Sequence, residues 1–339
     1  MPGPGQRPDE LRSGEPRPDE PRPSVWGGLT RYLDTPAKRT TALAAILAFM
    51  VAAPFLFGPY ATVILTNALL YTILALGLNV VVGYAGLLDL GYAAFFAVGA
   101  YTVGILTTDF HWNFWATIPV AILAAVVAGV IIGGPTLRLR SDYLAIVTLG
   151  FGEIVRISAR NLEITGAASG ISGIEQPWLF GWHIATQTDF YFVFLVLVVI
   201  AVVCSARLAN SRLGRAWLYV RHDEDAAEAM GIDRVRVKLA AYVIGAIYGS
   251  IGGVFFAVNL TAISPQSFSF QQSTLFLMAV ILGGMGKIPG VILGAFIVVL
   301  APELLRDLGS FRLLIFAVGL LLIMLFRPSG IWPARRGGR

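Results

Sequence analysis

The 339 residues would suffice for two soluble domains, but their composition excludes that arrangement. Apolar residues make up 56% of the chain, charged residues only 13%, and the mean hydropathy is +0.74. A soluble protein carries about 25% charged residues, so this composition indicates a chain embedded in lipid. It argues against soluble enzymes, nucleic-acid binders and disulfide scaffolds. Cys204 is the single cysteine, so no intrachain disulfide can form.

The N-terminal stretch differs from the rest of the chain. Residues 1–39 repeat Arg-Pro-Asp-Glu at 7–10 and 17–20, contain six prolines before residue 22, and offer almost nothing apolar to bury. Such a composition cannot support a packed core. The sequence therefore predicts a disordered cytoplasmic tail at 1–39, a transmembrane domain at 40–326 and a second cytoplasmic tail at 327–339.

Ten segments after this tail are long and apolar enough to be considered as membrane spans. A helix needs about 20 mostly apolar residues to cross a bilayer core about 30 Å thick. Segments 86–106 and 142–160 carry ionisable residues and 271–286 is short, so these three can be broken or re-entrant. The ten predicted segments are 40–57, 60–82, 86–106, 114–136, 142–160, 190–208, 238–262, 271–286, 290–305 and 311–326.

The distribution of positive charge supports this count. If ten helices are threaded from a cytoplasmic N-terminus, 21 of the 25 lysines and arginines fall on the cytoplasmic side, as the positive-inside rule requires. The opposite loops 107–113 and 161–189 contain neither residue type. The sequence thus predicts an all-α integral membrane protein with about ten transmembrane helices and both termini cytoplasmic. Because topology accounts for the net charge of +5, that charge does not indicate nucleic acid.

The longest polar stretch between spans, residues 209–238, lies on the predicted cytoplasmic side. Within it, residues 223–230 are predicted to form a short helix, because acidic residues at its start complement the helix dipole and Gly231 can end it. Loops in compact domains usually have about 4–6 residues. The stretch can be a solvated connector or a docking surface for a partner, and the pattern leaves both open.

Two glycine-rich turns, 83–91 and 283–290, fall at corresponding positions on the predicted inner face. They suggest a faint internal repeat with broken helices, but close packing of small residues is the favoured explanation. The second turn is not a phosphate-binding P-loop, because Ile281 and Ile288 occupy the positions of the first glycine and of the Ser/Thr. We therefore expect no ATPase site in this chain.

Ionisable residues at membrane depth are the other candidates for function. Glu153, Arg156 and Arg160 share one face of a predicted helix, and Asp89 lies in a predicted span. Such groups usually face a cavity or a partner, so they can line a pathway or form a closed structural pair. The histidines are scattered over different loops and predict no metal site: His111, His183 and His222.

Four stretches resemble the LivM-type membrane permease subunit of branched-chain amino acid ABC importers. They are 76–102, 135–157, 213–246 and 282–296, in the order of the family. The resemblance implies a bacterial cytoplasmic (inner) membrane protein that works with a LivH-type sister permease, two cytoplasmic ABC ATPases of LivG/LivF type and an extracytoplasmic solute-binding protein. ATP and magnesium would be used by the ATPases, so no cofactor is expected in this chain.

The same resemblance implies roles for individual residues. Asp225-Ala226-Ala227 followed by Gly231 is similar to the EAA–Gly pattern of ABC importers, with Asp in place of Glu and without the later Leu-Pro. The residues expected to couple to an ATPase are Arg221, Glu224, Asp225, Glu228 and Gly231. Those expected to line or support the translocation path are Asn79, Asp89, Glu153 and Arg156.

Two questions stay open at this point. The family's default substrates are leucine, isoleucine and valine, but similar permeases serve other amino acids, urea and amides. The alternative function is a stand-alone secondary transporter or channel for a small polar solute, which would need neither ATPase nor sister permease. An intramembrane enzyme would require a catalytic constellation, and the sequence displays none.

Overall fold

The computed structural model describes residues 36–136, 141–179, 181–309, 311–326 and 330–331. The chain divides into two units, residues 1–52 and 53–339. The predicted disordered tail lies outside the described residues except for 36–39, where that prediction is wrong because the first helix already begins at Pro36. The predicted C-terminal tail lies outside them as well, apart from residues 330–331.

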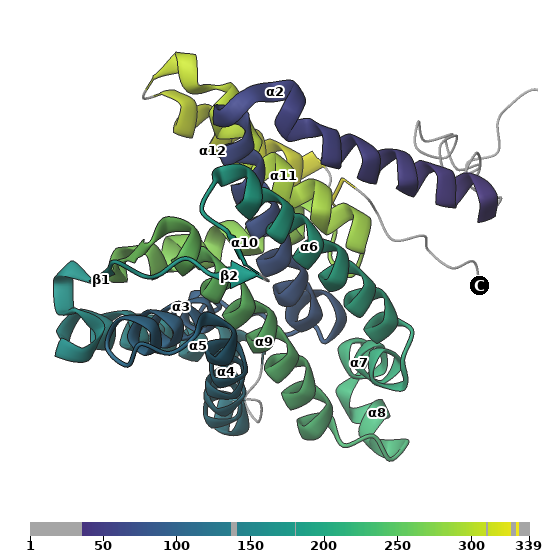
Figure 1. Ribbon diagram of the computed structural model, residues 1–339. Helices are drawn as coiled ribbons and strands as arrows, with labels where there is room; N and C mark the ends of the chain where they lie inside the picture. Colours follow the sequence, from purple (N-terminus) through teal and green to yellow (C-terminus); the bar gives the residue numbers. More distant parts are fainter. Residues whose placement is uncertain (1–35, 137–140, 180, 310, 327–329, 332–339) are drawn as a thin grey trace, which may run out of the picture. The chain divides into compact units, whose positions relative to one another are not determined.

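The fold is almost entirely helical (Figure 1), as the composition predicted. The main helices are α2 (Pro36–Leu78), the π-helix η2 (Asn79–Tyr84), α3 (Ala93–Thr108), α4 (Phe114–Thr136), α5 (Ser141–Asn161), α6 (Gln187–Ala209), α7 (Arg212–His222), α8 (Glu224–Ala229), α9 (Arg234–Leu260), α10 (Phe270–Gly283), α11 (Ile288–Leu304) and α12 (Phe311–Phe326). The short elements are the 3₁₀ turns η3 (Glu163–Thr165), η4 (Ala167–Ser169), η5 (Pro265–Phe268) and η6 (Arg306–Leu308) and the strands β1 (Ile171–Ser172), β2 (Trp178–Leu179), β3 (Trp182–His183) and β4 (Ala262–Ile263).

Every predicted span contains helix, but two boundaries differ from the prediction. The first two segments are joined in α2, which is kinked at Gly58 rather than interrupted. The helix predicted from residue 86 begins only at Ala93. Residues 85–92 form a buried turn instead, because Asp89 Oδ1 accepts a hydrogen bond from the N–H of Gly91, at 2.8 Å, and so competes with helical pairing.

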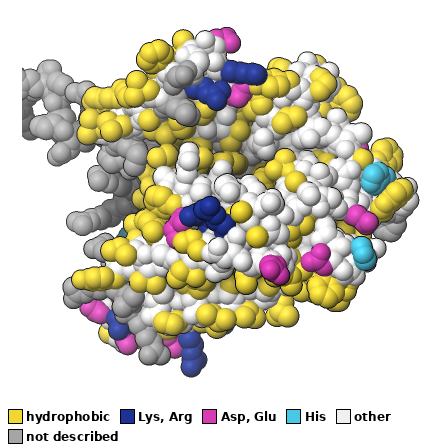
Figure 2. Space-filling view, turned by 90° about the vertical axis from the view of Figure 1, so that its left-hand side faces the viewer, with side chains coloured by type: hydrophobic (Ala, Val, Ile, Leu, Met, Phe, Trp, Pro, Cys, Tyr) yellow, Lys and Arg dark blue, Asp and Glu magenta, His cyan; other side chains and the backbone are white. Residues whose placement is uncertain are grey.

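Four helical stretches are long and apolar enough to cross a membrane by themselves: Leu47–Tyr84, Phe114–Thr136, Gln187–Ala209 and Arg234–Leu260. Shorter apolar helices accompany them at Ala93–Thr108, Phe270–Gly283 and Ile288–Leu304. The face shown in Figure 2 carries mainly hydrophobic side chains, with charged ones gathered in a few places. The protein is thus a multi-pass membrane protein, while the number of ten crossings and the sides of the termini stay predictions.

The core of the larger unit is the contact between α3 and α9. Glycines at every fourth position of α9 turn toward α3 and η2, as in small-residue interfaces of membrane helices. A Cβ at Gly249 would lie 2.9 Å from Phe95 Cβ, and one at Gly253 would overlap the carbonyl oxygen of Phe96. The two backbones therefore approach closely enough that no side chain fits between them.

The loops predicted for the outer side contact one another. Strand β1 pairs with β4 in an antiparallel ladder, with Ile171 opposite Ile263. The indole of Trp115 donates to the carbonyl oxygen of Trp178, at 2.7 Å. Trp112, Trp178 and Trp182 are all exposed, as expected of aromatic residues near a membrane interface.

Candidate coupling loop and intramembrane pocket

The loop between α6 and α9 contains two helices, of which α7 was not predicted. Ser211 caps α7 by accepting a hydrogen bond from the N–H of Gly214, at 3.1 Å. Gly214, Trp217 and Val220 form its buried face. Their spacing of three residues, after a serine, was the signal in the sequence that could have revealed this helix.

The second helix, α8, confirms the prediction for residues 223–230. The carboxylate of Asp223 accepts hydrogen bonds from the N–H groups of Asp225 and Ala226, both at 3.0 Å. Gly231 follows the helix with φ +83°, in the left-handed conformation that ends helices. The loop at 209–238 therefore contains two successive helices, α7 and α8, which we call the hairpin.

Ion pairs and one indole tie this hairpin to the start of α9. Lys238, whose side chain is only 4% exposed, pairs with Glu224 at 2.6 Å. Arg234 lies between Glu228, at 3.2 Å, and Asp225, at 3.6 Å. The Nε1–H of the buried Trp217 donates to the carbonyl oxygen of Val237, at 2.7 Å.

The outward surface of the hairpin carries large apolar side chains. Leu218, Tyr219 and Met230 are 42%, 54% and 64% exposed, respectively. The predicted coupling residues Arg221, Asp225 and Glu228 are exposed on the same two helices. Exposed apolar side chains grouped on a polar segment typically mark a surface that contacts another protein.

The two glycine-rich turns, predicted to lie on the same inner face, contact each other. Asn79 is fully buried in η2, and its Oδ1 accepts a hydrogen bond from the N–H of Gly286, at 2.8 Å. Arg221 in α7 donates from Nη1 to the carbonyl oxygen of Gly83. The structure thus brings together Arg221, Asn79 and both turns, through hydrogen bonds between residues that are 138 and 207 positions apart in the chain.

The other predicted pathway residues lie elsewhere. Glu153 and Arg156 form an ion pair at 2.6 Å on α5. Asp89 is fully buried in the 85–92 turn, and its Oδ2 has no hydrogen-bond partner among the described residues. This turn packs on α5, since a Cβ at Gly152 would lie 3.2 Å from the Cα of Gly91. Asp89 and the Glu153–Arg156 pair therefore belong to two elements, the 85–92 turn and α5, that pack on each other.

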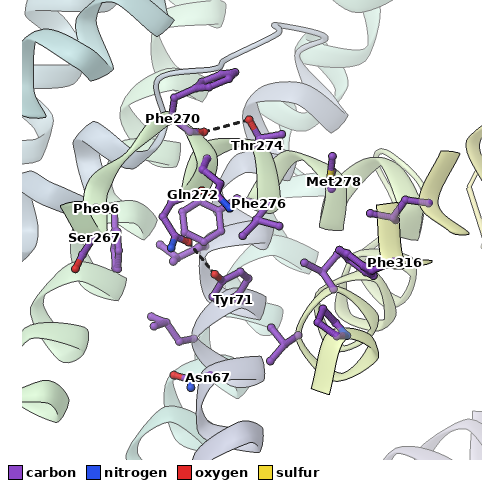
Figure 3. A pocket seen from close by; sticks show the side chains of 18 of the residues that line it. Asn67, Tyr71, Phe96, Ser267, Phe270, Gln272, Thr274, Phe276, Met278 and Phe316 are labelled. Atoms are coloured by element: carbon purple, nitrogen blue, oxygen red, sulfur yellow. Dashed lines mark hydrogen bonds between the residues drawn. The ribbon is translucent and has the colours of Figure 1, made fainter. Parts of the chain in front are cut away.

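A cavity of about 1340 Å³ lies among α2, α10, α11 and α12 (Figure 3), and residues of α3 and α9 add to its lining. Its lining is mainly apolar, and none of the four predicted pathway residues contributes to it. The hydroxyl of Tyr71 donates to Gln272 Oε1, at 2.8 Å. Asn67 and Gln271 add further uncharged polar groups to the lining. In chemical terms the cavity suits an apolar group next to hydrogen-bonding atoms.

No group of three or more His, Cys, Asp or Glu side chains that could hold a metal ion occurs within the described ranges. The described residues combine a multi-pass helical body, a partly open cavity and two short helices on a polar loop. A multi-pass helical body with a cavity between its helices is the arrangement expected of a membrane transport protein.

Comparison with known proteins identifies the family. Residues 60–326 match the family described as "Branched-chain amino acid transport system / permease component", so the chain belongs to this family. It is 42% identical over 323 residues to the high-affinity branched-chain amino acid transport system permease protein LivM of Salmonella typhimurium and to that of Escherichia coli K12; in both cases 88% of this chain and 76% of the relative are covered.

The sister type of permease is also a relative. LivH of Salmonella typhimurium is 24% identical over 288 residues, covering 77% of this chain and 90% of LivH. No solved structure matches the chain significantly. The resemblance to LivM stated from the sequence is confirmed, and family membership favours a permease subunit over a stand-alone transporter or channel.

Proposed function

We propose that this chain is the membrane subunit of an ATP-driven importer for branched-chain or related small amino acids in the bacterial cytoplasmic membrane. It works beside a LivH-type sister permease, with two cytoplasmic ATPases and an extracytoplasmic solute-binding protein. The observation that carries the proposal is the α7–α8 hairpin, which is tied to α9 by an ion pair and a hydrogen bond and which exposes large apolar side chains.

The hairpin has the properties of a docking element. Its attachment by Lys238 and Arg234 means that a force on α8 acts on α9 as well. Met230, at the end of α8, is the most exposed large apolar side chain of the hairpin. Well-packed apolar anchors of this kind supply most of the binding energy of an interface. Closure of the ATPase pair would therefore move α8 and, with it, the helix that forms the core contact with α3.

The docking surface can be tested with one substitution and a matched control. Met230→Glu places a charge on the proposed interface, whereas Arg236→Ala removes an 88% exposed side chain from the same loop. We expect Met230→Glu to lower co-purification of the ATPases at least about tenfold, a loss of roughly 1.4 kcal/mol, while Arg236→Ala leaves it unchanged. Equal ATPase recovery in both variants would contradict the docking proposal.

The cavity supports an amino acid with an apolar side chain as the substrate. Its lining includes Leu70, Phe276 and Val298, and among the described residues no Asp, Glu, Lys or Arg contributes to it. The apolar side chain of a branched-chain amino acid can be desolvated there, while amides and the Tyr71 hydroxyl offer hydrogen bonds. The charged ammonium and carboxylate groups would need further partners, which a sister permease can supply across a shared path.

The alternative, a stand-alone transporter, makes an opposite prediction. The chain, purified alone and placed in vesicles, should show no uptake of labelled leucine, because it lacks an ATPase site and half of the path. Uptake should appear only when the sister permease, both ATPases, the binding protein and ATP are added. Uptake by the chain alone would favour the stand-alone transporter.

A further inference from the structure

We propose that Arg221 is a positioning residue that clamps the α7–α8 hairpin to the inner ends of the helices around the cavity, so that movement of the hairpin reaches the translocation path. The inference rests on the proposed function and assigns Arg221 a different place in it. The sequence suggested that Arg221 contacts the ATPase, whereas its guanidinium group lies against the membrane body of its own chain.

The contacts of Arg221 join two turns at once. Its Nη1 donates to the carbonyl oxygen of Gly83, in the last turn of η2. The backbone at Gly286 and Gly86 also lies close to the Arg221 side chain. A Cβ at Gly286 would lie 3.6 Å from Arg221 Nη1, and a Cβ at Gly86 would lie 2.8 Å from Arg221 Cγ. Both glycines have positive φ, +81° and +73°. A side chain at either position would therefore be disfavoured both by the backbone conformation and by the nearby atoms.

The chemistry of this contact favours a cation. The last carbonyl groups of a helix have no partner within the helix, and they carry its partial negative charge. Arg221 meets this need at the end of η2, with Asn79 Oδ1 binding the N–H of Gly286 beside it. A second contact, in which the rings of Tyr84 and Trp217 stack at 6.4 Å and 3°, attaches the same helix α7 to the same end of η2.

The two turns are the inner ends of helices that line the cavity. Asn67 and Tyr71 belong to α2, which continues directly into η2, and Tyr71 lies about 20 Å from Tyr84 along a helix with 1.5 Å rise per residue. The 284–287 turn connects α10 and α11, and both contribute to the lining. Arg221 is thus hydrogen-bonded to the end of one cavity helix and lies close to the turn that joins two others, whereas the ion pairs of α8 among the described residues are with Arg234 and Lys238 of α9.

The first test compares substitutions on α7 in the complete importer, assembled with its sister permease, ATPases and binding protein in vesicles. Arg221→Ala should leave ATPase recovery and ATP hydrolysis within about twofold but lower leucine uptake per ATP about tenfold, the loss of one charge-assisted hydrogen bond. Arg221→Lys should retain part of the coupling. The control is Arg215→Ala, because Arg215 donates only within the loop, to the carbonyl oxygen of Asn210 at 3.0 Å.

A second test replaces the clamp by a reversible covalent bond. A Cβ at Gly86 would lie 3.4 Å from Arg221 Cβ, close to the 3.5–4.5 Å found in disulfides. In a Cys204→Ser background, the pair Gly86→Cys and Arg221→Cys should be uncoupled when reduced and regain uptake per ATP when oxidised, with loss again on adding reductant. Each single cysteine variant, measured alone, gives the loss of leucine uptake per ATP that its own substitution causes.

The outcomes separate this inference from the proposed function. Normal coupling in Arg221→Ala, or an oxidised pair that is crosslinked but stays uncoupled, would overturn the clamp. Loss of the ATPases from Arg221→Ala, with Arg215→Ala unaffected, would make Arg221 a docking residue and would also overturn it. Failure of Met230→Glu to weaken ATPase binding would contradict the docking proposal without any effect on the clamp measurements.

Discussion

The two sides of α3 differ in how much space they leave. Toward α9, glycines bring backbones together so closely that a methyl group at Gly253 would overlap a carbonyl oxygen. Toward α10, α11 and α12, the helices leave a partly open cavity of about 1340 Å³. We therefore expect α3 and α9 to move together as a rigid body, since close-packed interiors are barely compressible. The helices around the cavity, in contrast, have room to shift relative to one another.

The largest effect is expected from adding a single methyl group to the packed side. Gly253→Ala should destabilise the protein by about 3 kcal/mol or more, because the backbones of α3 and α9 must separate. The matched control is Gly319→Ala in α12, where nothing lies within 4 Å of the added Cβ and where we expect little change or a slight gain. Thermal unfolding in detergent, followed by size-exclusion chromatography, measures both; equal melting temperatures would refute the comparison.

Filling the cavity should affect transport while sparing the fold. Ala317→Phe adds a ring at the cavity lining on α12, so the protein should accumulate normally but the KM for leucine uptake should rise severalfold. Ala121→Phe places the same ring at a fully buried position of α4 and should prevent folding. Expression and uptake of the two variants distinguish these outcomes, and a folded Ala317→Phe variant with unchanged KM would remove the cavity from the path.

The smallest effect on stability is expected from removing a single tyrosine hydroxyl group, either on the packed side of α3 or on its cavity side. Tyr92 is fully buried and donates to the carbonyl oxygen of Gly245, at 2.9 Å, whereas Tyr71 donates to Gln272 at the edge of the cavity. We expect Tyr92→Phe to cost about 1–2 kcal/mol, because the carbonyl oxygen of Gly245 loses a buried partner. Tyr71→Phe should cost less than about 1 kcal/mol. Melting temperatures measure both losses of stability. A larger loss in Tyr71→Phe than in Tyr92→Phe would contradict the expected difference between the packed side and the cavity side.

Much of the helical framework could be predicted, because apolar runs bounded by polar loops fix where helices lie. Segments 114–136 and 311–326 match α4 and α12 at both ends. The short helix in the coupling loop and its glycine stop were also predicted correctly, since capping is a local property. The late start of α3 was missed, because a buried Asp89 side chain, not hydrophobicity, decides the backbone there.

The candidate site was predicted less completely. The cavity depends on residues such as Tyr71 and Gln272, which lie 201 positions apart and meet only after folding. The sequence placed both glycine-rich turns on one side, but it could not show that they touch or that Arg221 points at one of them. The GxxxGxxxG spacing of Gly245, Gly249 and Gly253 is a sequence signal of close helix packing, but the contact between α3 and α9 was not predicted from it.

The ladder between β1 and β4 has a mechanical consequence. It joins the loop after α5 to the end of α9 on the predicted outer side, while α8 is attached to the other end of α9. Helix α9, with 27 residues, is about 40 Å long. If the ladder acts as a pivot, a tilt of about 5° displaces the far end by roughly 3–4 Å over that length. In that case α9 would act as a lever, which converts a small displacement of its α8 end, on the predicted inner side, into a tilt of the helix that packs on α3.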